Sequence, residues 1–159
     1  MNANSNFLKA LVLTNFSERY YRMCEQFPLR LEMPQCKAPA PVILRLAAEI
    51  GPVKKLSPGR CFEFELPGES SKNKMVLVVQ KPTMVEIFYS VVYSGVCVES
   101  SFAITAREVL MFGGEPSPQP PYPRPVFQSH EELRSVLAET YSLGSLLTFT
   151  PCSSDPSTV

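Results

Sequence analysis

The single histidine, His130, limits the catalytic chemistry that this sequence can support. Any Ser-His-Asp or Cys-His arrangement would need that imidazole to activate its nucleophile. His130 precedes Glu131 and Glu132 in the first turn of a predicted helix, a position typical of a solvated side chain. We therefore expect no enzyme. The alternative, an enzyme that uses a thiol such as Cys97, would require a thiolate activated without a nearby histidine.

The five cysteines are odd in number, widely spaced and without a C-x-x-C pair. Zinc sites and disulfide frameworks depend on closely spaced or paired cysteines, so we expect neither and interpret these residues as free thiols. The phosphate-binding patterns G-x-x-x-x-G-K and G-x-G-x-x-G are also absent from the sequence. No metal and no cofactor is therefore expected.

Glu63 and Glu65 form a carboxylate pair that could in principle serve acid–base chemistry. Residues two apart on a strand share a face and lie about 7 Å apart, which suits several glycosidase geometries. Such chemistry also needs a cleft and unequal environments for the two groups. An exposed strand face explains the pair more simply.

The positive charge is concentrated in residues 1–60, which hold nine basic and four acidic side chains, although the whole chain has 15 of each. Attraction between this segment and the acidic C-terminal third is the simplest interpretation. The alternative is a nucleic-acid-associated domain that uses the basic N-terminal third, with Arg19, Tyr20, Tyr21 and Arg22 as the best stacking candidate. We regard nucleic-acid binding as the weaker of these two interpretations.

Helical periodicity appears in three places. Apolar residues recur at three- and four-residue steps over residues 6–27, where Ser17 and Glu18 allow a restart after a break at Asn15. A second helix is predicted over residues 41–50, because Gly51 and Pro52 end it. Ser129 with Glu132 forms a capping box, which predicts a third helix over residues 130–141.

Between these helices the periodicity changes to two, the mark of strands. Strands are predicted over residues 61–66, 75–79, 84–93 and 96–106, with 107–112 either extending the last strand or forming a fifth. Residues 143–149 are expected to dock as a short extended segment. The result is an α+β fold: a four- or five-stranded antiparallel meander with two N-terminal helices and one C-terminal helix packed on it.

We expect residues 1–150 to form a single globular domain, with a Pro-rich connector at 113–126 and a disordered tail at 151–159. No apolar run is long enough to span a membrane, and no leader pattern is present, so an intracellular protein of the cytoplasm or nucleus is expected. The final residues Ser157, Thr158 and Val159 fit a PDZ ligand, a pattern that short tails often match by chance.

The strand over residues 84–93 is apolar on both faces. Val85, Ile87, Tyr89, Val91 and Tyr93 point one way, and Met84, Phe88 and Val92 point the other. Helices on one face leave the second to be covered by the C-terminal segment or by another subunit. Met84, Phe88 and Val92 are therefore candidate partner-binding residues.

Six prolines lie between Pro116 and Pro125, a density that favours a polyproline II rod. Aromatic-lined SH3 and WW grooves bind such rods, although the spacing here matches neither ligand pattern fully. A stiff connector across the sheet is the alternative interpretation. The second set of candidate partner-binding residues is Pro120, Pro121, Tyr122, Pro123 and Arg124.

The sequence thus predicts a non-catalytic protein–protein interaction domain, acting as a subunit or adaptor of a multiprotein complex. Its expected partner is another protein, in a hetero- or homo-oligomer formed through an apolar sheet face. No membrane partner is expected.

Overall fold

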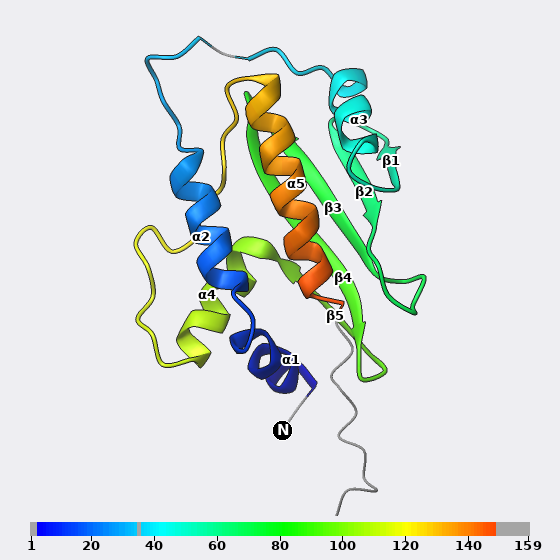
Figure 1. Cartoon of the computed structure of the whole chain (residues 1–159), viewed down its shortest axis with the longest axis vertical. Coiled ribbons are helices and arrows are strands. Elements are labelled where there is room, and N and C mark those ends of the chain that lie inside the picture. Colours follow the sequence, from blue (N-terminus) through cyan, green and yellow to red (C-terminus); the bar gives the residue numbers. More distant parts are fainter. Residues whose placement is uncertain (1–2, 35, 149–159) are drawn as a thin grey trace, which may run out of the picture.

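The computed structural model describes residues 3–34 and 36–148, which form five helices and one five-stranded sheet (Figure 1). The strands lie side by side in chain order, and each is antiparallel to the next, which confirms the predicted α+β meander. The tail at 151–159 and its PDZ-like end lie outside the described residues. In chain order the elements are α1 (Ala3–Val12), α2 (Phe16–Gln26), α3 (Ala40–Ala48), β1 (Val53–Leu56), β2 (Cys61–Glu65), β3 (Lys74–Gln80), β4 (Met84–Tyr93), β5 (Val96–Ser101), α4 (Phe102–Phe112) and α5 (His130–Leu146).

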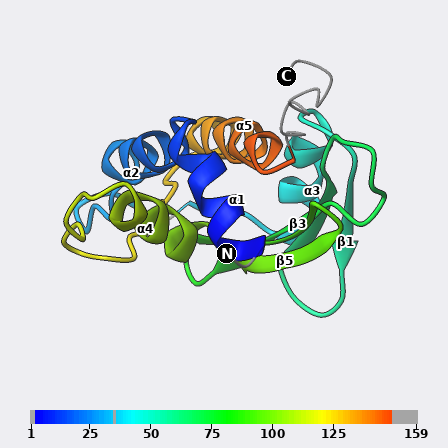
Figure 2. The same ribbon diagram turned by 90° about the horizontal axis from the view of Figure 1, so that it is seen from below.

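The N-terminal periodicity resolves into two helices, because α1 ends at Val12 and α2 begins after Asn15. With α3, three helices precede the sheet, one more than predicted. Figure 2 shows α2, α3 and α5 on the same side of the strands. None of the helices in the described part of the chain is long and apolar enough to cross a membrane.

The C-terminal helix α5 is longer than its predicted range of residues 130–141. The expectation of an extended segment from Leu143 onward is wrong, because α5 continues to Leu146 and buries Leu143 on the same stripe as Leu133 and Val136. Gly144 allows this helix to lie close to the sheet. A Cβ atom there would come within 2.8 Å of a Leu66 methyl carbon.

The predicted strand over residues 96–106 is confirmed only as far as Ser101, and the prediction of strand over 107–112 is wrong, because α4 occupies Phe102–Phe112. β5 ends at Ser101, whose side-chain oxygen accepts a 3.2 Å hydrogen bond from the Ile104 backbone N–H and so caps α4. Buried residues then recur at helical spacing, namely Phe102, Ala103, Thr105, Ala106 and Val109. The β-branched residues in this stretch suggested a strand, but capping and tertiary packing override that preference.

The fifth strand is instead β1, which was not predicted. It pairs with β2 and forms one edge of the sheet, with β5 at the other edge. β1 has only four residues, and both Lys54 and Lys55 are exposed. The predicted strand count therefore holds, although a different segment supplies the fifth strand.

The helices cover the face of β4 that carries Val85, Ile87, Tyr89, Val91 and Tyr93, all of which are buried in the single apolar core. Phe88 points the other way and is 45% exposed, while Met84 and Val92 are half-buried. The predicted separation of the two sets is confirmed. We call the side opposite the helices the open sheet face.

Candidate protein-binding face

The open sheet face is hollowed where β4, β5 and the start of α4 meet. Two cavities adjoin there, of about 500 Å³ and about 420 Å³, and Phe88, Ser101 and Ile104 line both of them. The first extends towards Val76 and Glu99, and the second extends towards the Pro-rich connector. We call this pair of cavities the β4 hollow.

Three large apolar side chains from three different segments expose much of their surface in the β4 hollow. Phe88 is 45%, Ile104 43% and Tyr122 41% exposed. Single exposed apolar residues are common on protein surfaces, but a group of them around a cavity is typical of an interaction site. Aromatic residues in such pockets commonly dominate binding free energies.

The sheet and the cap of α4 place two of these side chains. Phe88 lies between Val76 of β3 and Ser101 of β5 in the strand register. Ser101 then starts α4, so that Ile104 follows within the first helical turn. The hydrogen-bonded ladders and the cap therefore hold Phe88 and Ile104 in place before any partner arrives.

Tyr122 is held from the connector side by Arg107 of α4. The Arg107 guanidinium carbon lies 5.5 Å from the centre of the Tyr122 ring, within the range of a cation–π contact. The Arg107 Nε–H also donates a 2.9 Å hydrogen bond to the Ser117 hydroxyl oxygen. One side chain of α4 thus fixes two points of the connector.

Arg124 joins the connector to the floor of the β4 hollow. Its guanidinium forms an ion pair with Glu86 of β4, a carboxylate that is only 5% exposed. A buried carboxylate is stabilised by such a pair, since an unpaired charge there would be costly. The floor of this part of the β4 hollow therefore carries compensating charges.

The two predicted sets of partner-binding residues meet here only in part. Phe88, Tyr122 and Arg124 line the same cavity. Met84 and Val92 line neither cavity. The Met84 backbone forms a bridge with Val126, and the Val92 N–H donates to the Asn73 side-chain oxygen at 2.9 Å.

The remaining connector residues face α2. Pro120 and Pro123 line a different cavity, beside that helix. The Tyr20 hydroxyl donates to the Pro123 carbonyl oxygen at 2.6 Å, and the Tyr21 hydroxyl donates to the Pro121 carbonyl oxygen at 3.3 Å. These bonds attach the connector to α2, as expected of a docked segment whose carbonyl groups are partly in use.

Sequence reasoning missed Ile104 and Arg107, because both lie in the stretch that was predicted as strand. Ser101 followed by apolar residues at 102, 106 and 109 was the available signal for a capped helix. That signal competes with the strand preference of Ile104 and Thr105.

Two of the groups considered for chemistry, Glu63 and His130, contact neighbouring parts of the domain. The Lys54 ammonium lies 3.2 Å and the Lys74 ammonium 3.9 Å from the Glu63 carboxylate, so Glu63 takes part in ion pairs on the sheet. His130 Nε2 is hydrogen bonded to the Lys37 carbonyl at 3.0 Å. Residues 3–34 and 36–148 contain no group of three His, Cys, Asp or Glu side chains placed to hold a metal ion.

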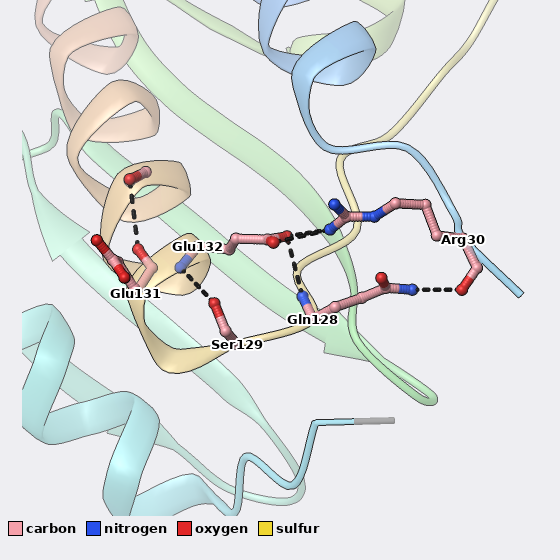
Figure 3. Close-up of polar contacts among 6 residues, drawn as sticks. Arg30, Gln128, Ser129, Glu131 and Glu132 are labelled. Atoms are coloured by element: carbon pink, nitrogen blue, oxygen red, sulfur yellow. Dashed lines mark hydrogen bonds and ion pairs between the residues drawn. The ribbon is translucent and has the colours of Figure 1, made fainter. Parts of the chain in front are cut away.

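A polar cluster at the start of α5 connects this helix to the loop after α2 (Figure 3). The Glu132 N–H donates to Ser129 Oγ at 3.0 Å, as the capping box predicts. The Glu132 carboxylate accepts from the Gln128 N–H and from Arg30, whose Nη2 lies 2.5 and 2.7 Å from its two oxygens. Gln128 donates in turn to the Arg30 carbonyl. The contacts are those of a structural clamp.

Two of the basic residues in the N-terminal third are paired with α5. Arg30 pairs with Glu132, and Arg19 Nε lies 2.8 Å from the Glu139 carboxylate. These contacts agree with the interpretation that the basic and acidic ends of the chain attract one another. They leave fewer unpaired cations in the N-terminal third that could contact a phosphate backbone.

No known protein family, characterised protein or solved structure matches this chain. The β4 hollow and the other described contacts are therefore the basis for a functional assignment.

Proposed function

We propose that this chain is a non-catalytic protein-interaction domain, a subunit or adaptor that binds a partner protein through the β4 hollow. The observation that carries the proposal is the convergence of Phe88, Ile104 and Tyr122 around two adjoining cavities. Each side chain comes from a different element and is held by contacts within the domain. Such a preorganised apolar surface binds without a large entropic cost for ordering it.

Charge around the β4 hollow is consistent with a protein surface as the ligand. Arg124 is paired with Glu86, and the other cavity is lined by Glu63 and Glu99 with Lys74 as the one cation among the described residues of its lining, so neither end of the hollow attracts nucleic acid strongly. The alternative of a nucleic-acid-associated domain has less support, because Arg19 and Arg30 of the basic third are already paired.

The test is affinity capture of the full chain and two matched variants from a lysate of the native cells. Phe88→Ser removes the centre of the β4 hollow. Val96→Ser changes a side chain of similar exposure, 47%, that lies outside it. A partner should stay bound to the wild type and Val96→Ser through a high-salt wash. Phe88→Ser should weaken binding about 30-fold, the effect of losing a hot-spot residue worth about 2 kcal/mol.

Thermal unfolding of both variants controls for loss of the fold. Equal retention of the same partner by wild type and Phe88→Ser would contradict this use of the β4 hollow. If the wild type loses its partner in the high-salt wash, the result would instead favour a ligand bound through charge.

A further inference from the structure

A separate cavity of about 610 Å³ lies between α2, α4 and the connector. Figure 1 shows the connector, drawn in yellow, running beside these two helices. Its walls are largely apolar, and four of the lining residues are the prolines Pro28, Pro118, Pro120 and Pro123. The volume is within the range of small-molecule sites in proteins.

The proline wall is attached at several points, so the cavity is formed in the absence of a ligand. The Tyr20 and Tyr21 hydroxyls donate to connector carbonyls, and the Arg107–Ser117 hydrogen bond holds the segment farther along. Proline also restricts the backbone, which limits collapse of the wall into the cavity. A ligand would therefore meet a largely fixed shape.

The side of the cavity formed by α2 carries two carboxylates on either side of an aromatic ring. Glu18, Tyr21 and Glu25 are three and four residues apart, so they share one face of the helix. Among the described residues neither Glu18 nor Glu25 is part of an ion pair. Arg124 is the single cation in the lining and is already paired with Glu86. The lining therefore carries a net negative charge, although Arg107 of α4 lies near enough to Tyr21 for its positive charge to act on that phenol.

We propose that this cavity binds a small organic cation, an amine or guanidinium group carried on an apolar or aromatic body. The apolar body fits against the prolines and Leu110, and the cationic group lies near Glu18, Glu25 and the face of Tyr21. Carboxylates attract the positive charge, and an aromatic face adds a cation–π contribution. The site is independent of the β4 hollow, although Arg124 lines both.

The test compares three probes that share one body and differ in charge: phenylbutylamine, phenylbutanol and phenylbutyrate. Each is titrated into the ¹⁵N-labelled full chain, and binding is followed by amide chemical shifts. The amine should shift amides of α2 and those of Gln119, Tyr122 and Arg124, the connector residues in this stretch that carry an amide N–H. It should bind about fivefold more tightly than the alcohol, as expected for a partly exposed ion pair, and the butyrate should bind most weakly.

The double variant Glu18→Gln/Glu25→Gln should bring the amine down to the affinity of the alcohol and leave the alcohol itself unchanged. Glu69→Gln is the control, since Glu69 is exposed and lies outside the cavity lining. The proposal is overturned if the amine and the butyrate bind equally, if the double variant keeps the preference, or if no probe shifts these amides. Unchanged binding of the alcohol shows that the double variant is folded.

Discussion

The buried carboxylate of Glu86 is paired with the guanidinium of Arg124, which joins the start of β4 to the connector 38 positions later in the chain. Replacing Arg124 leaves that charge without its partner. Arg124→Met should lower the free energy of unfolding by about 2 kcal/mol, less than for a fully buried pair because the Arg124 side chain is 37% exposed. Urea denaturation measures the change.

The double variant Glu86→Gln/Arg124→Met tests the origin of this cost. It should be more stable than Arg124→Met alone, because the buried charge is removed as well. If the double variant is no more stable, packing of the arginine stem accounts for the loss.

Gly144→Ala should destabilise the protein even though alanine favours helices. The added methyl carbon would lie 2.8 Å from Leu66 Cδ2 and 3.0 Å from Met75 Sδ, both in the core. We expect a net loss of about 1 kcal/mol, because overpacking outweighs the gain in helix propensity. Gly113→Ala is the control, since its nearest contact would be 3.4 Å, and urea midpoints should place it close to wild type.

Ser101→Ala removes the cap that turns β5 into α4. The Ile104 N–H then loses its acceptor, so the free energy of unfolding should fall by about 1 kcal/mol. Ser129→Ala at the start of α5 is the matched comparison, because Ser129 accepts the same kind of bond from Glu132. A chemical denaturation curve with no shift for Ser101→Ala would show that α4 does not depend on this cap.

Stability should decrease in alkali because of Tyr89. Burial raises the pKa of this phenol to about 12 from an ordinary value of 10.0, although its hydrogen bond with Thr105 opposes the shift. The folded state therefore holds the proton more tightly. The contribution of the protonated Tyr89 to the free energy of unfolding is fully present below about pH 10. It is lost as the pH rises through the folded pKa, by about 3 kcal/mol in total.

Urea denaturation at several pH values between 9 and 12 measures how steeply the free energy of unfolding falls with pH. Cys24 adds to the loss of stability in alkali, because burial raises the pKa of its thiol to about 12 from 9.0. Its stabilising contribution begins to fall near pH 9. Tyr89→Phe should make the decline shallower above pH 10. A slope identical to wild type would assign the alkaline effect to other groups.

Local patterns predicted most of the sheet and the cap of α5. The alternation over residues 84–93 correctly separated the buried face from the face of Phe88, and Ser129 with Glu132 marked the start of a helix. Both features depend on neighbours in sequence. Both features can therefore be predicted from the sequence without knowledge of the fold.

The parts that sequence reasoning missed depend on distant contacts. β1 is short and acquires its structure by pairing with β2. The hollow requires Phe88, Ile104 and Tyr122 to meet, which depends on α4 forming after Ser101 and on Arg107 holding the connector. Apart from the cap at Ser101, no local pattern in the sequence encodes those contacts.

The lysines of β1 have a consequence for how the protein behaves when concentrated. An edge strand exposes backbone groups that can pair with another chain, and short length and lysine side chains both oppose such pairing. β1 has four residues and carries Lys54 and Lys55, so this edge strand discourages the edge-to-edge pairing of sheets that leads to fibres. We therefore expect β1 to oppose self-association of the chain at this edge of the sheet.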